Sequence, residues 1–277
     1  MLLLHVPTHR RFPSAAGPRG LTIGDVVQPG DAFESLSVII PAYNAARCVA
    51  DTLDAVQAWL AAHELANEVI VVDDGSADRT AEIVEQRGRG VRLLRNGVNR
   101  GKGYSVRAGM LASTGAWALF LDVDHSTHIR HLERFVEPAA GADVLIGSRR
   151  VGGARILRRQ HRLRQLLGRS FPYLVRALAL RDVQDTQCGF KLFRRAAVDA
   201  IFPRQRVERF AFDVEVLLLA RRMGFRIAEI PVDWDNPTDS TLRISCDTLV
   251  MFVDVLRTVC RLRGGRIPDG DSRVSRE

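Results

Sequence analysis

Two aspartates that are two residues apart, Asp122 and Asp124, follow a short apolar run that ends at Leu121. Side chains two residues apart in an extended segment point to the same side, so both carboxylates can converge on one cation. Carboxylate oxygens suit Mg²⁺ or Mn²⁺, which bind through one or two such groups together with substrate phosphates. The pair therefore predicts a divalent-metal site that holds a diphosphate and stabilises its charge as it leaves. A solvated turn is the alternative interpretation.

Two further polar segments have residue types that suit a nucleotide. A carboxylate of Asp73 or Asp74 can accept a hydrogen bond from the imino N–H of uracil or guanine, and Gly75 permits a tight turn. Capping of the next helix is the alternative for this segment. The segment Gly101-Lys102-Gly103 precedes a helical pattern. Backbone N–H groups at a helix start, together with a lysine, suit a phosphate or a sugar hydroxyl.

The elements that must position these residues alternate between strand and helix. Strands are predicted at 36–41, 68–73, 91–94, 117–121 and 143–147. A helical pattern follows each of the first three. Continuous apolar runs between helices predict a mostly parallel sheet that is covered on both faces. Ligands of such sheets bind at the carboxyl ends of the strands, which is where these polar motifs stand.

After residue 147 the pattern becomes basic and amphipathic. Ten arginines and no acidic residue occur from 149 to 181, interleaved with apolar residues at approximately helical spacing. We interpret this stretch as a helix that lies on an anionic membrane surface, with an ordinary domain helix as the alternative. The remaining predicted elements are a strand at 188–193, a helix at 212–222, a strand at 226–232 and an amphipathic helix at 244–262.

The composition is that of a globular protein with anionic partners. The chain has 277 residues, of which 46% are hydrophobic, a net charge of +8 and a sequence pI of about 10.1. Such a charge points to phosphates, nucleic acid or an acidic membrane face. No apolar run approaches the roughly 20 residues that span a bilayer. The four cysteines have no CxxC spacing, which favours reduced thiols in the cytoplasm.

The chain divides into four predicted parts. We expect residues 1–34 to be a poorly ordered lead that is rich in Gly and Pro. It does not resemble a secretory signal, because its apolar start is too short and precedes the basic residues. Residues 35–235 form one catalytic domain, 236–264 a C-terminal amphipathic helix and 265–277 a flexible tail. His128 and His131 are close in sequence but do not have a metal-ligand spacing.

Several motifs occur in order and carry a resemblance to a known family. They are Pro41-Ala-Tyr-Asn44, Val72-Asp-Asp-Gly-Ser76, Asn99-Arg-Gly-Lys-Gly103 and Asp122-Val-Asp124. This set resembles the family 2 glycosyltransferases, which have the α/β, Rossmann-like GT-A fold. Three further segments resemble the polyprenyl-phosphate branch, the dolichyl-phosphate glucosyl- and mannosyltransferases: Ile146-Gly-Ser-Arg149, Asp185-Thr-Gln-Cys-Gly-Phe-Lys191 and Arg209-Phe-Ala-Phe-Asp-Val-Glu215.

The resemblance implies an inverting transfer of a hexose from a nucleotide-diphosphate sugar to polyprenyl phosphate, with bound Mg²⁺ or Mn²⁺. The wording of the segment at 185–193 favours glucose from UDP-glucose. The alternatives are a mannosyltransferase that uses GDP-mannose, or a soluble family 2 transferase that acts on a small molecule or glycan. Ala45, where many members carry Glu, and the segment at 125–127 depart from the family pattern and leave the donor open.

By matching positions, the resemblance gives each motif residue a role. The nucleotide-binding residues would be Pro41, Tyr43, Asn44, Asp73, Asp74, Gly75, Lys102 and Asp122. The metal ligands would be Asp122 and Asp124. The catalytic residues would be Asp124, Asp213 and Arg149, and the contacts to acceptor or phosphate would be Arg149, Gln187 and Lys191. The resemblance implies a nucleotide sugar and a polyprenyl-phosphate lipid as partners. The basic stretch from 149 to 181 adds an anionic membrane, and we expect it to attach the protein peripherally to the cytoplasmic face.

A phosphate acceptor simplifies the chemistry. The second pKa of a phosphate monoester is about 6, so at neutral pH the acceptor is already a nucleophile and needs no general base. Asp213 is the candidate orienting group or base if the acceptor is a hydroxyl. Asp213 and Glu215 are two apart on a predicted helix and cannot share a face, and a surface charge or cap is the alternative for Glu215. A nucleic-acid surface is disfavoured, because the strand-end carboxylates would repel phosphates.

Overall fold

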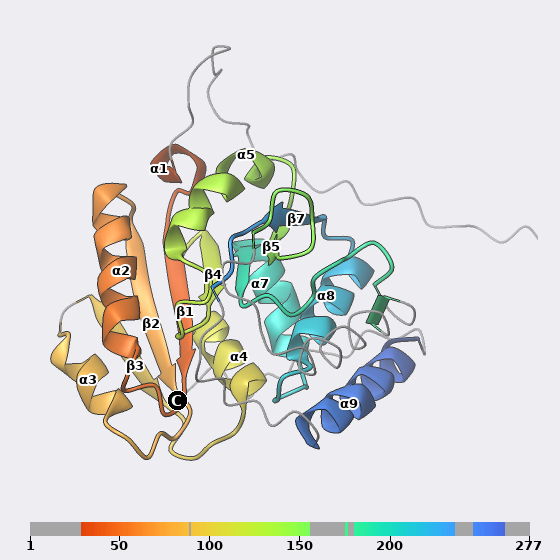
Figure 1. Ribbon diagram of the computed structural model, residues 1–277. Helices are drawn as coiled ribbons and strands as arrows, with labels where there is room; N and C mark the ends of the chain where they lie inside the picture. The colour runs from red at the N-terminus through yellow and green to blue at the C-terminus, as the bar shows by residue number, and fades with distance from the viewer. Residues whose placement is uncertain (1–28, 89, 156–174, 177–179, 236–245, 264–277) are drawn as a thin grey trace, which may run out of the picture.

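A seven-stranded sheet forms the centre of the protein (Figure 1). The computed structural model describes residues 29–88, 90–155, 175–176, 180–235 and 246–263. The strands are β1 (Leu36–Ala42), β2 (Asn67–Asp73), β3 (Val91–Arg95), β4 (Trp117–Leu121), β5 (Val144–Ser148), β6 (Phe190–Arg194) and β7 (Ile227–Pro231). Their spatial order is β3-β2-β1-β4-β6-β5-β7.

Most neighbouring strands run in parallel, as the apolar runs predicted. β1 pairs in parallel with β2 and with β4, β2 with β3, and β5 with β7. The exception is β6, which runs antiparallel to both of its neighbours, β4 and β5. Because β1, β2 and β4 are parallel, their carboxyl ends meet at one edge of the sheet, and the predicted polar motifs come together there.

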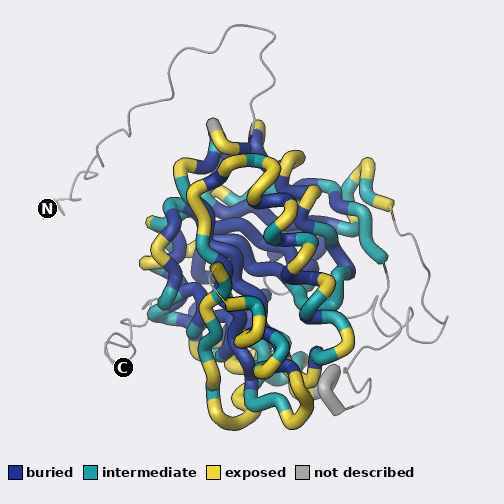
Figure 2. Tube along the Cα trace, turned by 90° about the vertical axis from the view of Figure 1, so that its left-hand side faces the viewer, coloured by how far each residue is buried: buried dark blue, intermediate teal, exposed yellow. Residues whose placement is uncertain are grey.

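Helices cover both faces of this sheet. They are α1 (Pro29–Ala32), α2 (Val49–Ala62), α3 (Thr80–Gln86), α4 (Lys102–Ala112), α5 (Val136–Ala139), α7 (Arg195–Ile201), α8 (Phe212–Arg222) and α9 (Cys246–Arg263), with short 3₁₀ helices η1 (Ile129–Phe135) and η2 (Phe202–Arg204). Alternate residues of β1 face opposite layers. Val38 and Ile40 share a core with α2 and η1, whereas Ile39 packs with α4, α7 and α8. Figure 2 shows the buried strands between these layers.

The last predicted helix, at 244–262, corresponds to α9, which packs against the core through Val255, Val259 and Leu262. Most of the predicted basic helix lies outside the described residues, as do the lead up to residue 28 and the tail beyond residue 263. Within the described ranges, no helix combines the length and the apolarity needed to cross a membrane.

Candidate active site

The two aspartates lie in a turn that follows β4. Asp122 is the first residue after the strand, and Asp124 precedes His125, whose φ of 58° is left-handed. Thr52 of α2 holds this turn by donating its hydroxyl hydrogen to the carbonyl of Val123 over 2.7 Å. The turn, rather than the alternation of an extended strand, therefore sets the direction of the two carboxylates.

Asp122 lies directly against the backbone of Gly189. Its N–H donates to the Gly189 carbonyl over 3.0 Å, and a Cβ atom on Gly189 would lie 1.9 Å from the Asp122 Oδ2 atom. Only glycine therefore fits at this position while Asp122 keeps its place. Sequence reasoning did not single out Gly189. The available signal was a glycine immediately before a strand and inside a motif of the family.

Lys102, the first residue of α4, contacts the first of these aspartates. Its Nζ atom lies 2.6 Å from the Oδ1 atom of Asp122, and about a quarter of the lysine side chain is exposed. Burial opposes the charge on Lys102, but Asp122 and Asp213 raise its pKa above the ordinary value. Lys102 therefore stays charged and can neutralise a phosphate that reaches this edge of the sheet.

Asp122 and Asp124 have the donor chemistry of a divalent-metal site. Burial, and then the charge of Asp122, raise the pKa of Asp124, so a cation between the two would relieve their repulsion. One Asp124 oxygen accepts the N–H of Ser126 over 3.0 Å. In the described part of the chain, no three His, Cys, Asp or Glu residues gather as a metal-ligand group. A cation here would therefore need water and substrate phosphates as its other ligands, as Mg²⁺ sites commonly do.

A buried ion pair joins β6 to α8 near this turn. Lys191 has no exposed surface, and its ammonium contacts the carboxylate of Asp213 and the carbonyl of Cys188. Lys102 and Lys191 both lie over the ring of Phe120, 5.3 and 5.6 Å from its centroid. Burial raises the pKa of Asp213, while Lys191 and then Lys102 oppose that shift. The structure thus places the Lys191 ammonium in the interior against Asp213, with no exposed surface to offer an acceptor.

Arg149 and Asp185 form a bidentate pair. The Nε and Nη2 atoms of Arg149 lie 2.7 and 2.9 Å from the two carboxylate oxygens. Burial opposes the charge on Asp185, but Arg149 holds the pKa of that carboxyl down at about 2. Two buried polar atoms of the same loop, Oγ1 of Thr186 and Nε2 of Gln187, make no hydrogen bond with a described residue. Buried polar groups rarely stay unpaired, so this loop offers unused contacts to a ligand.

Asp74 ties two loops together. Its carboxylate accepts hydrogen bonds from the side chain of Asn96 over 2.7 Å and from the backbone N–H groups of Arg100 and Gly101 over 3.0 and 2.8 Å. These bonds fix the loop that leads into Lys102. Asn96 was missed by the sequence prediction, although its place directly after a strand was a usable signal.

The other predicted nucleoside residues lie at the ends of β1 and β2. Asp73 accepts the N–H of Ser76 over 3.3 Å and is buried. The left-handed Asn44 donates its N–H to the Ser76 hydroxyl over 2.9 Å, and its side-chain oxygen accepts the N–H of Ala77 over 2.8 Å. Tyr43 is 41% exposed, so its ring is open to a ligand at this edge.

Pro41 and Gly75 contribute backbone shape to the same edge. Pro41 is buried within β1 and lies opposite Val72 of β2. Gly75 has a φ of 72°, and a Cβ atom there would lie 2.5 Å from the carbonyl carbon of Val98. Only glycine therefore allows the loops that follow β2 and β3 to approach so closely.

Glu215 is neither a surface charge nor a helix cap, so that alternative is wrong. Its side chain has no exposed surface. One oxygen accepts the N–H groups of Arg206 and Val207 over 2.9 and 2.6 Å, and the other contacts Arg261 of α9. Asp213 contacts Lys191 instead, so the two carboxylates of α8 point in different directions, as their spacing predicted.

The fold is shared with glycosyltransferases of known structure. Glucosyl-3-phosphoglycerate synthase from Mycobacterium tuberculosis, solved with Mn²⁺, UDP-glucose and phosphoglyceric acid, gives a TM-score of 0.65 at 22% identity over 91% of this chain and 86% of that chain. Mannosyl-3-phosphoglycerate synthase from Rubrobacter xylanophilus gives 0.63 at 16% identity over 85% and 77%. The sheet with its flanking helices thus has the fold of these two enzymes, the GT-A fold.

The family follows from the sequence comparisons. The profile described as "Glycosyl transferase family 2" matches residues 37–202, more than half of the chain, and the protein belongs to that family. A dolichyl-phosphate beta-glucosyltransferase of Trichomonas vaginalis is 34% identical over 268 residues, which cover 91% of this chain and 78% of that protein. The dolichyl-phosphate beta-glucosyltransferase of Saccharomyces cerevisiae is 33% identical over 244 residues, 80% of this chain and 73% of that protein.

Proposed function

We propose that the protein transfers glucose from UDP-glucose to the phosphate of a polyprenyl lipid, with inversion at the anomeric carbon. The observation that carries the proposal is the identity of 33–34% with two dolichyl-phosphate beta-glucosyltransferases over 73–78% of their lengths. The geometry supports the donor half of the reaction, because carboxylates and a charged lysine meet at the sheet edge where Tyr43 is open to a nucleoside.

On the donor side, Asp122 and Asp124 would hold Mg²⁺ or Mn²⁺. The bound ion would supply positive charge to the diphosphate as the bond to glucose breaks. Lys102 adds a second, permanent positive charge beside Asp122. Gly189 leaves room for the Asp122 carboxylate, and Thr52 fixes the turn between the two aspartates. This arrangement is pre-formed, so little reorganisation is needed when charge develops on the leaving group.

On the acceptor side, the lipid phosphate needs no general base, because it is ionised at neutral pH. One phosphate oxygen attacks the anomeric carbon of glucose from the side opposite the diphosphate, and the bond to the diphosphate breaks. Arg149 and Gln187 would orient the acceptor phosphate. Arg149 is paired with Asp185, two residues before Gln187, and the Nε2 atom of Gln187 makes no hydrogen bond with a described residue. Asp213 is neutralised by Lys191. We assign this pair the role of positioning Lys102 and β6 rather than of moving a proton.

We further propose that the protein works on the cytoplasmic face of a membrane, attached peripherally. The lipid acceptor requires access to a bilayer surface, and the net charge of +8 suits an anionic leaflet. The anionic membrane thus joins the nucleotide sugar and the polyprenyl phosphate as a proposed partner.

A radiolabelled donor panel tests the function. UDP-glucose, GDP-mannose and UDP-galactose are each offered with polyprenyl phosphate and Mn²⁺, and the organic phase is counted. We expect label only from UDP-glucose, and none after addition of EDTA or with Asp124→Asn. Label from GDP-mannose would favour a mannosyltransferase. Label that reaches only a water-soluble acceptor, such as phosphoglyceric acid, would overturn the lipid acceptor.

A further inference from the structure

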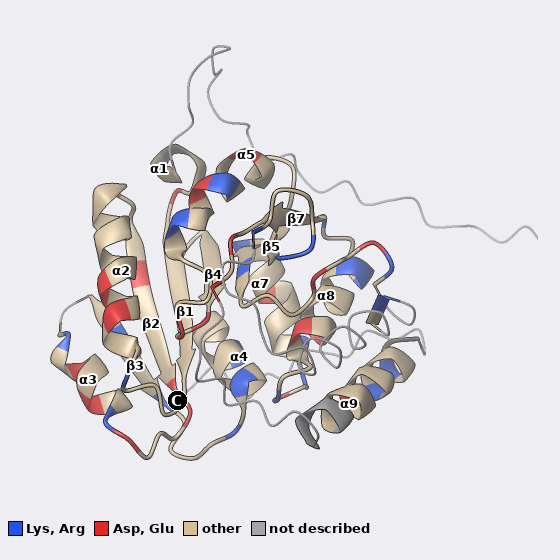
Figure 3. Ribbon diagram, viewed as in Figure 1, with Lys and Arg blue, Asp and Glu red and all other residues tan. Residues whose placement is uncertain are grey.

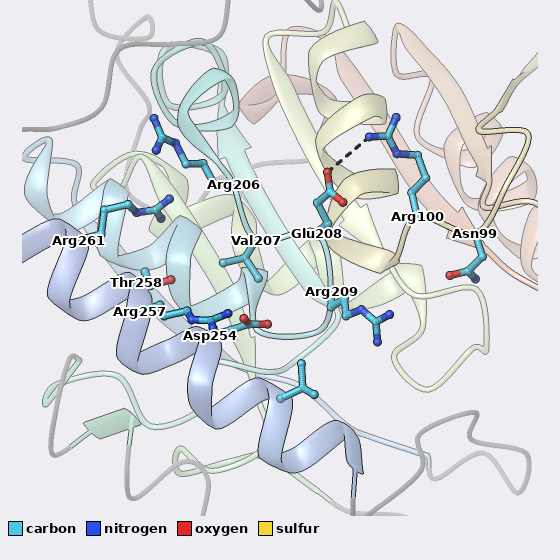
Figure 4. A pocket seen from close by; sticks show the side chains of 11 residues that line it. Asn99, Arg100, Arg206, Val207, Glu208, Arg209, Asp254, Arg257, Thr258 and Arg261 are labelled. Atoms are coloured by element: carbon cyan, nitrogen blue, oxygen red, sulfur yellow. Dashed lines mark ion pairs between the residues drawn. The ribbon is translucent and has the colours of Figure 1, made fainter.

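A basic groove of about 710 Å³ opens between α9, the loop at 206–209 and the loop at 99–100 (Figure 4). Its lining has five arginines and two acidic residues, so the net charge of the lining is 5 − 2 = +3. The arginines are Arg100, Arg206, Arg209, Arg257 and Arg261, and the acidic residues are Glu208 and Asp254. Figure 3 shows the basic residues of α9 on this side of the molecule.

Three of the arginines carry a charge that no described residue neutralises. Arg100 and Arg261 are paired with neighbouring acids. Arg206, Arg209 and Arg257 are exposed and make no ion pair within the described ranges. Three exposed guanidinium groups around one groove favour a ligand with phosphate groups, which arginine can bind through two parallel hydrogen bonds.

Among the described residues, the groove lining contains no aromatic side chain. Its apolar residues are Val207 and Val250, and the exposed Val98 is adjacent in sequence to the groove residue Asn99. Phe252 and Leu256 of α9 are also exposed, but they do not line the groove. At about 3.6 residues per turn they lie on the opposite side of the helix from Asp254 and Arg257, so the groove surface is basic rather than amphipathic.

We propose that this groove docks on a bilayer surface that carries anionic lipid headgroups. The exposed arginines bind the headgroup phosphates, whose charge complements the net positive charge of the lining. A single-stranded nucleic acid suits the groove less well, because its described lining has no aromatic side chain on which bases could stack. The biological purpose of this docking rests on the proposed function, because a lipid acceptor must be met at a membrane.

The docking surface and the candidate active site share one loop. The carbonyl of Glu208 accepts the N–H of Tyr104 over 3.0 Å, and it lies 2.5 Å from where a Cβ atom of Gly101 would be. Gly101 directly precedes Lys102, which contacts Asp122. A protein docked through this groove would therefore hold its nucleotide edge next to the membrane.

Vesicle flotation of the full chain tests the docking surface. The vesicles contain phosphatidylcholine alone or with phosphatidylserine, and no polyprenyl phosphate. We expect binding that requires phosphatidylserine and weakens with salt. Each arginine near an anionic surface changes the partition about fivefold, so Arg206→Gln/Arg209→Gln/Arg257→Gln should lower it about a hundredfold. Phe252→Ser/Leu256→Ser changes the opposite side of α9 and should float like the parent protein.

A matched variant separates this surface from general charge. Arg79→Gln/Arg92→Gln/Arg226→Gln removes the same charge from exposed positions that do not line the groove, and should bind within about threefold of the parent protein. Equal losses in both triple variants would overturn the proposal. So would unchanged flotation of the groove variant, or loss of a dimer in the groove variant, which would make this face an interface between copies. Retention on heparin or DNA without any vesicle binding would also refute it.

Failure of the docking proposal can be told apart from failure of the proposed function. If the groove variant transfers glucose to polyprenyl phosphate at the parental rate in detergent, but more slowly than the parent protein when the polyprenyl phosphate is in anionic vesicles, both proposals stand. If it is as active on vesicles as the parent protein, docking fails while the function stands. If the parent protein floats with anionic vesicles but transfers no glucose to the lipid, the function fails while docking stands.

Discussion

Arg261 of α9 forms an ion pair with Glu215 of α8, and the Glu215 side chain has no exposed surface. The same carboxylate accepts two N–H groups from the loop at 206–207. That loop continues to Glu208, whose carbonyl lies against Gly101, the residue before Lys102. One buried carboxylate thus links the C-terminal helix, a wall of the basic groove and the lysine of the candidate active site.

Removal of Arg261 should destabilise the protein. We predict that Arg261→Met lowers the free energy of unfolding by about 3 kcal/mol, because it leaves a buried carboxylate without its cation. This loss in the free energy of unfolding is at the low end for a buried pair, because a quarter of the Arg261 side chain is exposed. Guanidinium unfolding measures it, and Arg261→Lys should restore most of the loss.

The control is an exposed ion pair of α8, the helix that carries Glu215. Arg221 contacts Asp182, whose side chain is 71% exposed, so Arg221→Met should cost less than about 1 kcal/mol. If both methionine variants unfolded at the same denaturant concentration, the buried pair would have no special role.

Gly189 should be irreplaceable for transfer. We predict that Gly189→Ala lowers kcat at least a hundredfold, because the new Cβ atom would occupy the place of the Asp122 carboxylate and move a metal ligand. Initial rates with radiolabelled UDP-glucose measure this effect, with circular dichroism to confirm the fold. Gly152→Ala is the matched control, since a Cβ atom there meets no heavy atom within 4 Å. Normal turnover of Gly189→Ala would show that Asp122 does not act where we place it.

The sequence predicted the parts of the fold that depend on local pattern. The apolar runs around Val38, Val71 and Leu119 are buried strands because each is covered on both faces, and such coverage leaves a continuous hydrophobic signature. The carboxylates at the strand ends were found for the same reason, since a polar residue directly after such a run lies at the carboxyl edge. The direction of β6 was not predictable, because the pattern of a buried strand is the same when it is read in either direction.

Residue roles that depend on distant partners escaped the sequence analysis. Lys191 was expected to face a phosphate, but its partner Asp213 lies 22 residues away and reaches it only because β6 packs under α8. Glu215 is 46 residues from Arg261, so nothing nearby in the chain marks it as buried. The hydrogen bonds of Asp74 depend on two loops that approach at Gly75, a contact set by backbone geometry.

Lys102 should contribute to the chemical step more than to folding. We predict that Lys102→Met lowers kcat by about a hundredfold to a thousandfold, because a preorganised positive charge near the leaving diphosphate is lost. Lys102→Arg should recover part of the rate. Steady-state kinetics with UDP-glucose measure both.

The comparison for Lys102 is Arg95→Met, which removes a cation that is paired with Glu85 at an exposed position on β3. This variant should keep parental kinetics. If Lys102→Met changed only KM, the lysine would bind the ground state and the transition state equally.

His131 should make the stability of the protein depend on pH in mildly acidic solution. It is 3% exposed on η1, and burial, with Arg134 next, lowers its pKa to about 4. The histidine of the unfolded chain has a pKa near 6.5, so between about pH 4 and 6.5 it binds a proton in the unfolded chain but not in the folded protein. Stability is therefore complete above about pH 6.5 and falls as the pH drops towards 4, by at most about 3 kcal/mol.

Urea unfolding between these pH values should show a flatter dependence for His131→Phe. His125→Asn is the control for the loss of a histidine side chain, because Asn tolerates the left-handed backbone of that position. A parental slope in His131→Phe would assign the acid sensitivity to other groups.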